Sequence, residues 1–206
     1  MRRALVLTSG GLDSTVALWW ARREGYDVAP LTFHYPGRPR GEKRATREIV
    51  ALAGLEAIEA ELPFLHEASD ADAARRQSRF RGAPPGYIPA RNALFYAAAC
   101  YHANVLGCEA VVGGHNAEDA ARFPDASRRF FADLESLLHR GLWTAPGVPA
   151  PRLEMPLLGL DRAGVLALGA ELKAPIDATW SCYEDGEGPC GVCPACLQRG
   201  PASATA

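Results

Sequence analysis

The sequence predicts an α/β protein built around a parallel β-sheet, and two observations lead to this fold class. Short apolar runs alternate along the chain with longer segments of helical periodicity. The first apolar run, residues 4–7, leads through a glycine-rich turn directly into a helical pattern. Alternating strands and helices are typical of a parallel sheet covered by helices on both faces. We therefore expect ligands to bind beyond the carboxyl ends of the strands.

Strands are expected where short apolar runs are bounded by turn residues. In chain order these runs are residues 4–7, 28–34, 55–62, 109–112 and 152–155. Pro30 lies inside the second run. Because proline cannot donate a hydrogen bond to a neighbouring strand, it is expected near the start of that strand.

Helices are expected where apolar residues recur at helical spacing. In chain order they are residues 14–24, 42–53, 92–106, 127–139 and 161–172, with a short charged helix near 67–76 in an otherwise irregular stretch at 63–89. Gly25, Gly54 and Gly107 each follow one of these segments, and glycine is typical just after the end of a helix. The residues that this order gathers at one rim of the sheet are 8–15, His34, Tyr35 and 113–119.

Residues 8–15, Thr-Ser-Gly-Gly-Leu-Asp-Ser-Thr, form the turn between the first strand and the first helix. Gly10 and Gly11 let an anion approach the main chain, and the N–H groups of the first helical turn can donate to phosphate oxygens. The hydroxyl donors in the same turn are those of Ser9, Ser14 and Thr15. This stretch therefore predicts a phosphate-binding loop.

Asp13 needs a separate explanation, because a carboxylate does not attract a phosphate. Its presence makes sense if it holds a magnesium ion or caps the helix. No Gly-Lys-Ser/Thr follows the glycines, so the loop is not of the Walker type. The plainer alternative is a Gly-Ser turn in which Asp13 is only a cap.

Four cysteines near the C-terminus, Cys182, Cys190, Cys193 and Cys196, have the spacing of a metal site. Two overlapping Cys-x-x-Cys units and one upstream cysteine can close a tetrahedral site of four thiolates. Four protein ligands leave no position for water, so we expect one structural Zn²⁺ per chain. A redox Cys-x-x-Cys pair is the alternative. The two remaining cysteines are expected to be buried packing residues.

Length and composition favour a single globular domain. Residues 1–200 are expected to form it, including the zinc-binding segment at 180–199, while the small residues 201–206 are expected to be a disordered tail. The net charge of −2 argues against binding nucleic acid through the overall field of the chain. We recognise no signal peptide and no apolar run as long as a membrane span, so a cytoplasmic protein is expected.

The pattern Ser-Gly-Gly-x-Asp-Ser-Thr resembles the PP-loop of the ATP pyrophosphatase superfamily, whose fold is Rossmann-like and adenine nucleotide alpha hydrolase-like. Those enzymes cleave ATP between the α and β phosphates, usually to adenylate an oxygen atom of a substrate. The resemblance implies ATP as co-substrate with Mg²⁺. The residues that it implies for nucleotide binding are Thr8, Ser9, Gly10, Gly11, Leu12, Asp13, Ser14, Thr15, Val16, Ala17 and Leu18.

Further segments resemble one PP-loop family, the 7-cyano-7-deazaguanine synthases of the queuosine pathway, over nearly the whole chain. The matching segments are Tyr87-Ile88-Pro89-Ala90-Arg91-Asn92, the stretch from Gly114 to the triplet Phe123-Pro124-Asp125, and the cysteine segment from Ser181 to Arg199. The combination is more specific than the loop alone.

This family converts 7-carboxy-7-deazaguanine, ammonia and ATP to the nitrile, through an adenylated carboxylate and an amide. The residues to which the resemblance gives catalytic roles are Asp13, Ser14, Arg91 and Asp119. Arg91 would bind a phosphate or the substrate carboxylate, and a surface ion pair is the alternative. Asp119 would accept hydrogen bonds from the guanine-like edge, or would only cap a helix. Tyr87 and Phe123 are candidates to sandwich the flat ring, although aromatic residues more often belong to the core.

The sequence also departs from the family. The segment 35–40 lacks the usual glutamine and histidine, Ala126-Ser127 replaces Cys-Arg, and Arg162 stands where a lysine is usual. These departures leave open a paralogue that adenylates a deazapurine acid but couples it to another amine or stops at the amide. Less favoured are a tRNA-modifying PP-loop enzyme, which would need a basic platform or an extra domain, and a zinc-stabilised nucleotide-binding module without catalysis.

The partners that follow are small molecules: a deazapurine acid, ATP and ammonia. No nucleic acid and no membrane is expected as a partner. Members of the family often pair, so the resemblance allows a homodimer.

Overall fold

The computed structural model describes residues 2–65, 87–182, 184, 186, 188–193, 196 and 197. Five parallel strands form one sheet in the order β3-β2-β1-β4-β5. They are β1 (Arg3–Leu7), β2 (Asp27–His34), β3 (Ile58–Glu61), β4 (Ala110–Val112) and β5 (Arg152–Glu154). The α/β fold with a parallel sheet is therefore confirmed. The helix expected near 67–76 and the tail at 201–206 lie outside the described residues.

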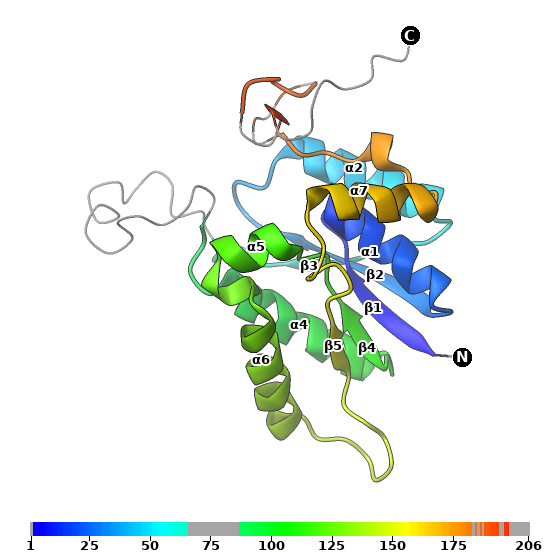
Figure 1. Cartoon of the computed structure of the whole chain (residues 1–206). Coiled ribbons are helices and arrows are strands. Elements are labelled where there is room, and N and C mark those ends of the chain that lie inside the picture. Colours follow the sequence, from blue (N-terminus) through cyan, green and yellow to red (C-terminus); the bar gives the residue numbers. More distant parts are fainter. Residues whose placement is uncertain are drawn as a thin grey trace, which may run out of the picture.

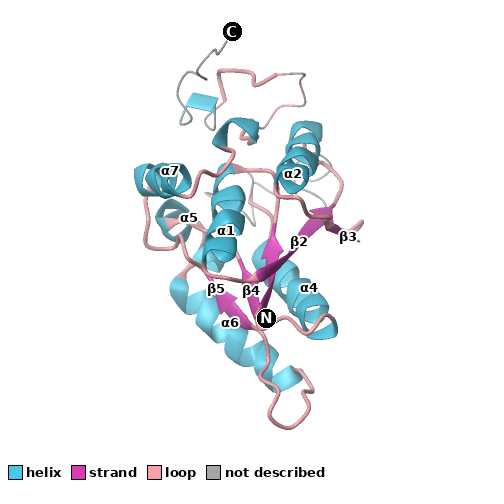
Figure 2. Cartoon of the chain, turned by 90° about the vertical axis from the view of Figure 1, so that its right-hand side faces the viewer, coloured by secondary structure: helices cyan, strands magenta, loops and turns pink. Residues whose placement is uncertain are grey.

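Helices cover both faces of the sheet, as Figures 1 and 2 show. They are α1 (Leu12–Arg23), α2 (Arg40–Leu52), α4 (Arg91–Val105), α5 (Ala117–Arg122), α6 (Arg128–Gly141) and α7 (Arg162–Glu171), with 3-10 turns at Pro124–Ala126 and Ile176–Ala178. Five of them match the expected helices to within a few residues. The sixth, α5, was not predicted. It is short, and none of its residues is buried, so it leaves no apolar stripe in the sequence.

Two apolar clusters form the core, one on each face of the sheet. The first joins α1 and α7 to the sheet through residues such as Val16 and Val165, and the second joins α4 and α6 through residues such as Tyr96 and Phe131. Central strand β1 contributes to both, because Ala4 and Val6 face the first cluster while Leu5 faces the second. This alternation explains why the run at residues 4–7 is apolar throughout.

Pro30 was wrongly expected at the start of the second strand. It lies in the middle of β2, opposite Val6 of β1. Leu31 accepts a hydrogen bond from Thr8 beyond the end of β1, so Pro30 faces the other neighbour, β3. β2 pairs with β3 only from Leu31 onward. Pro30 therefore has no partner residue in β3 that would need the N–H that proline lacks. The ring therefore costs the sheet no hydrogen bond.

The third strand begins later than expected. Residues 55–57 precede the strand, and Leu55 closes the end of α2, because its N–H donates to the carbonyl of Val50 at 3.0 Å around Gly54. Leu55 then packs against the first core cluster. This hydrogen bond and the apolar contact are typical of a glycine-terminated helix.

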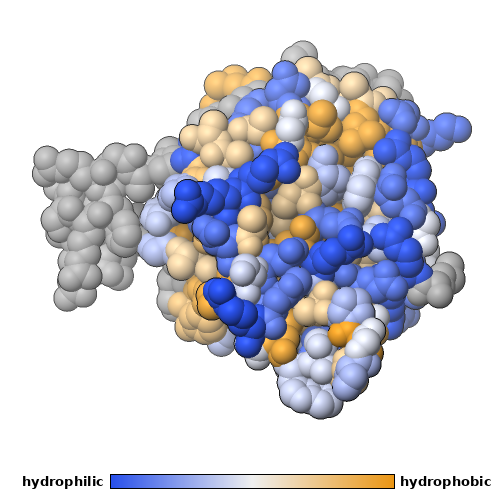
Figure 3. Space-filling view, turned by 60° about the horizontal axis from the view of Figure 1, so that its bottom comes forward, coloured by the Kyte–Doolittle hydropathy of each residue, from blue (hydrophilic) through white to orange (hydrophobic). Residues whose placement is uncertain are grey.

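The surface is of the kind common to globular domains. On the face shown in Figure 3, hydrophilic side chains predominate and the hydrophobic ones form small separate groups. Among the described residues, no helix is both long and apolar enough to cross a membrane.

Candidate functional site

A cavity of about 290 Å³ opens at the carboxyl ends of the strands. The order of the strands reverses direction between β1 and β4, and in sheets of this kind ligands bind at such a switch point. The loop after β1 and the loop after β4 approach each other closely here. A Cβ atom on Gly114 would lie 2.7 Å from the carbonyl oxygen of Asp13, so only glycine permits this approach. The expected rim is therefore a real concave site.

The loop between β1 and α1 has its carbonyl groups engaged. The oxygen of Ser9 accepts a hydrogen bond from Arg38 Nη2 at 2.8 Å, and that of Gly11 accepts from the hydroxyls of Ser14 and Thr15 at 3.0 and 2.8 Å. Gly11 is the N-cap of α1, and no side chain caps this helix end. Main-chain N–H groups at such an end, and the positive end of the helix dipole, favour an anion. The loop is suited to bind phosphate.

Arg38 is the residue that fixes this loop to the neighbouring elements, and sequence reasoning missed it. Its side chain is 2% exposed. It donates to the carbonyl of Phe33 at 2.7 Å and to the hydroxyls of Thr32 and Thr46 at 2.9 Å each, in addition to Ser9. A buried guanidinium needs this many acceptors to offset its desolvation. The sequence offered only a basic residue in a Pro-Gly-rich segment.

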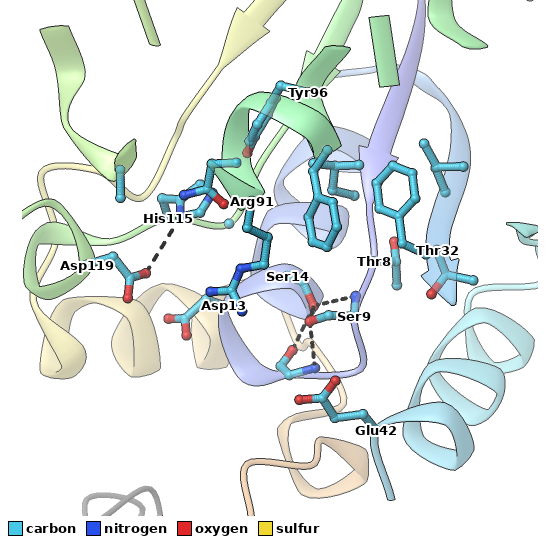
Figure 4. A pocket seen from close by; sticks show the side chains of 18 of the residues that line it. Thr8, Ser9, Asp13, Ser14, Thr32, Glu42, Arg91, Tyr96, His115 and Asp119 are labelled. Carbon is cyan, nitrogen blue, oxygen red and sulfur yellow. Dashed lines mark hydrogen bonds and ion pairs between the residues drawn. The ribbon is translucent and has the colours of Figure 1, made fainter. Parts of the chain in front are cut away.

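Asp13 points into the cavity from the first turn of α1 (Figure 4). Its Oδ1 accepts from Asn116 Nδ2 at 3.1 Å, and its Oδ2 lies 3.4 Å from Arg162 Nη1. Burial raises the pKa of Asp13, and the bonds to Asn116 and Arg162 only partly offset this effect. A carboxylate whose charge is so poorly compensated is suited to a cation.

Arg162, at the position where the sequence departs from the expected lysine, contacts the site through Asp13 but is not among the residues that line the cavity. Its Nε is buried and has no hydrogen-bond partner among the described residues. Arginine keeps the charge of lysine but presents a planar fork of donors.

Arg91 begins α4 and extends between Asp119 and Ser14 in the cavity (Figure 4). The residue before it, Ala90, is the N-cap and has a φ of 56°, in the left-handed region that disfavours residues with a Cβ atom. The start of this helix is held by Asp125, whose carboxylate accepts from the N–H of Asn92 at 3.2 Å. The Asn92 side chain in turn donates to the carbonyl of Asp125 at 2.8 Å. Asp125 thus positions the element that carries Arg91.

Asp119 lines the cavity from α5. It also takes part in a capping box, since the N–H of Asn116 donates to Asp119 Oδ2 at 3.3 Å while the Asn116 side chain accepts from the N–H of Asp119 at 3.0 Å. The carboxylate therefore caps a helix and faces the cavity at the same time. Burial raises the pKa of Asp119, while the hydrogen bond from Asn116 and the nearby Arg91 lower it.

His115 is a further lining residue; it lies in the expected rim segment 113–119, but sequence reasoning gave it no role. Its Nδ1 lies 3.9 Å from Asp119 Oδ2, and its ring packs against Tyr96 and Phe131. Burial and the charge of Arg91 lower the pKa of His115 to about 4. The imidazole is therefore neutral at neutral pH and offers the cavity a hydrogen bond rather than a charge.

An aromatic wall, formed by Phe33, Tyr35 and Phe95, lines another side of the cavity. The rings of Phe33 and Phe95 are stacked with centroids 4.5 Å apart. Phe123 also lines the cavity, whereas Tyr87 is not among the lining residues. Flat heterocycles bind against such surfaces. A sequence signal for Phe95 existed, because it lies one helical turn after Arg91 and so shares its face.

The structure divides the predicted nucleotide-binding residues into three groups. Thr8, Ser9, Gly11, Asp13 and Ser14 line the cavity. The side chains that pack into the apolar core are those of Leu12, Val16, Ala17 and Leu18. Gly10 and Thr15 are not among the lining residues; Gly10 has a φ of +86°, and Thr15 is fully buried. All four predicted catalytic residues, Asp13, Ser14, Arg91 and Asp119, lie at the same cavity.

The sulfur atoms of Cys182, Cys190, Cys193 and Cys196 lie within 4.8 Å of one another, a grouping that could hold a metal ion. Main-chain N–H groups point at them: those of Glu184 and Cys190 donate to the Cys182 sulfur at 3.4 and 3.3 Å. The N–H groups of Val192 and Cys193 lower the pKa of Cys190. Thiolates are the form that binds a metal, so these donors fit the predicted site. Cys100 and Cys108 are buried away from it, as expected.

Comparison with known proteins shows what the whole chain is similar to. A family model described as "Queuosine biosynthesis protein QueC" matches residues 3–206. The chain is 34% identical to the 7-cyano-7-deazaguanine synthase of Acetivibrio thermocellus, with 97% of this chain and 91% of the relative covered. It is 37% identical to the enzyme of the same name from an Anaeromyxobacter species, with 96% and 90% covered.

Solved structures share the fold. A 4-thiouridine synthetase in complex with RNA and bound ATP superimposes with a TM-score of 0.56 at 21% identity, covering 93% of this chain and 45% of that one. Identity at this level is informative about the fold alone. The structural match confirms the PP-loop type of α/β fold.

Proposed function

The chain belongs to the QueC family of queuosine biosynthesis proteins, and we propose that it is a 7-cyano-7-deazaguanine synthase. It would use ATP, with Mg²⁺, to join ammonia to 7-carboxy-7-deazaguanine and then to dehydrate the resulting amide to the nitrile. The observation that carries this proposal is one cavity in which an uncapped helix N-terminus and Asp13 face Arg91 and Asp119. The groups that would bind phosphate and metal belong to the start of α1, and those that would bind the acid are Arg91 and Asp119.

The first step is activation of the carboxylate. Its oxygen attacks the α-phosphorus of ATP, the bond to the β-phosphate breaks, and pyrophosphate leaves while an acyl-adenylate forms. The N–H groups at the start of α1, with Ser9 and Ser14, would hold the phosphates. Asp13 would hold the magnesium ion, which neutralises the charge that develops on the leaving group. Arg91 would align the substrate carboxylate or the α-phosphate.

Ammonia would then attack the activated carbonyl carbon, and AMP would leave. A second ATP would activate the amide oxygen, and loss of a second AMP would give the nitrile. Adenylation is needed both times because a carboxylate or amide oxygen is a poor leaving group. Free ammonium is the proposed source of nitrogen.

Asp119 would accept hydrogen bonds from the N–H groups of the guanine-like ring. Arg91 would bind the carboxylate of the same acid. Buried polar groups discriminate by up to about 10⁴-fold against ligands that lack the matching group. Asp119→Asn is therefore expected to raise the KM for the acid and to leave ATP affinity nearly unchanged. Equal losses for both ligands would instead point to Asp119 as a metal ligand.

We further propose that the four-cysteine cluster binds one structural Zn²⁺, that residues 1–200 form a single domain, and that the protein works in the cytoplasm. Pairing of two copies is also part of the proposal. Four thiolates leave no open coordination position, so the metal would stabilise the fold rather than act on substrate.

The decisive experiment is mass spectrometry of the products after incubation with 7-carboxy-7-deazaguanine, ATP, Mg²⁺ and ammonium. The nitrile and two equivalents of AMP are expected. Accumulation of the amide with one AMP would favour the paralogue that stops at the amide, which the departures at residues 35–40, Ala126 and Ser127 motivate. If no AMP forms under any condition, the proposal that this chain is an ATP-dependent enzyme is refuted.

A further inference from the structure

The carbonyl of Gly10 links the phosphate loop to the C-terminal part of the chain. It accepts a hydrogen bond from the main-chain N–H of Trp180 at 2.9 Å. Gly10 has a φ of +86°, and a Cβ atom there would lie 2.5 Å from the carbonyl of Glu42. The peptide of Gly10 is therefore confined between α2 and Trp180, and Trp180 helps to set its orientation.

Trp180 is in turn fixed to the cysteine cluster. Its indole Nε1 donates to the carbonyl of Cys182 at 2.8 Å, and Cys182 is the first of the four clustered thiols. Cys182 itself is 2% exposed. One residue thus bonds the phosphate loop through its main chain and the metal-binding segment through its side chain.

The indole ring is positioned by close packing on α2. A Cβ atom on Gly41 would lie 2.1 Å from the Trp180 ring, so the ring lies directly against the main chain of this helix. Arg44, one turn further along α2, lies 5.5 Å from the ring centroid and donates to the carbonyl of Gly186 at 3.2 Å. In Figures 1 and 2 the C-terminal segment lies at the same end of the molecule as α2.

We infer that Trp180 is a positioning residue that couples the four-cysteine metal site to the phosphate loop. With the metal bound, the cysteine segment holds Trp180, and Trp180 holds the Gly10 peptide in the orientation that presents the loop to ATP. Metal occupancy would then regulate ATP affinity and not only stability. The inference rests on the proposed ATP site, and it assigns to Trp180 no contact with substrate.

The variant that tests the coupling is Gly41→Ala. It removes no polar group, yet the added methyl must displace the indole ring from α2. Gly164→Ala is the matched control, because Gly164 also lies in the first turn of a helix, α7, and a Cβ atom there meets nothing nearer than 3.3 Å. Both proteins are prepared metal-loaded, and zinc content, melting temperature and calorimetric Kd for ATP with Mg²⁺ are measured.

We expect Gly41→Ala to keep one metal per chain and to bind ATP about five- to tenfold more weakly, the effect of losing about one hydrogen bond. Its KM for the acid should not change. Gly164→Ala should bind ATP like the wild type. A role in packing alone would lower the melting temperature of Gly41→Ala and leave its Kd for ATP unchanged, and that result would overturn the inference.

Trp180→Phe is the second test variant. If Gly41→Ala does not fold, the result for Trp180→Phe decides the test. This variant keeps a ring against Gly41 and the main-chain bond to Gly10 but loses the bond to Cys182. Weaker ATP binding with full metal content is expected, and wild-type affinity would refute the coupling. If the wild type itself binds no ATP, the proposed function falls together with this inference, whereas a wild-type Kd in both variants refutes the inference alone.

Discussion

Asp13 shows at the scale of one residue how the site is prepared for a cation. Its side chain is a quarter exposed, and the side chains that balance its charge among the described residues are the Asn116 amide and Arg162 at 3.4 Å. If it holds the magnesium ion, Asp13→Asn should lower AMP formation by about 10²-fold or more, the usual cost of losing one group that stabilises developing charge. Release of AMP with saturating Mg²⁺ measures the effect. Asp133→Asn, an exposed carboxylate on α6, is the control and should keep wild-type activity.

The raised pKa of Asp13 predicts that the effect of Asp13→Asn on the stability of the protein depends on pH. Burial raises the pKa of Asp13 in the native protein above its ordinary value of 3.8. The native state therefore binds this proton more tightly than the unfolded chain does, and stability is lost as pH rises through the raised pKa. Asp13→Asn should consequently unfold at higher urea concentration than the wild type at pH 7. Urea titrations below pH 3.8 should show no such advantage, and a variant that is less stable at pH 7 would contradict the prediction.

At the scale of elements, the start of α4 shows why two segments that resemble the same family, residues 87–92 and 123–125, lie together in the structure. The segment 87–92 and the Phe-Pro-Asp triplet meet through two hydrogen bonds between Asn92 and Asp125. Asp125→Ala should cost about 1 kcal/mol of unfolding free energy, as loss of a helix-capping carboxylate does. It should also reduce turnover, because Arg91 loses its support. Chemical denaturation and steady-state kinetics test both effects.

The comparison variant for Asp125→Ala is Asp133→Ala. Asp133 is 72% exposed and pairs with the exposed Arg129 one turn away on α6. Such pairs contribute at most about 0.5 kcal/mol. If both variants lose the same free energy, Asp125 does not hold the start of α4.

The elements that the sequence predicted are those whose signals are local. A glycine-rich turn between an apolar run and a helix is a property of neighbouring residues, and so is a Cys-x-x-Cys pair. The buried guanidinium of Arg38 is different, since its acceptors come from three separate stretches of chain. The position of Pro30 depended on where β3 begins, and none of the residues of α5 is buried. These features follow from tertiary neighbours, which one sequence does not display.

At the scale of the whole molecule, the cysteine cluster is expected to stabilise the chain through metal. Structural zinc sites contribute on the order of 10 kcal/mol, so Cys193→Ser should be metal-poor and should melt far below the wild type. Cys108→Ser is the control, because Cys108 is buried outside the cluster. Metal analysis and thermal melts are the measurements. Full zinc occupancy in Cys193→Ser would remove this cysteine from the site.

The two outer strands of the sheet limit how copies of this protein can associate. β3 and β5 are only four and three residues long, and each carries charged side chains, Glu59 and Glu61 on one and Arg152 and Glu154 on the other. Short charged borders resist the addition of a strand from a neighbouring chain. Any pairing of two copies is therefore expected through helices or loops, and crowding of this protein should not extend its sheet into larger assemblies.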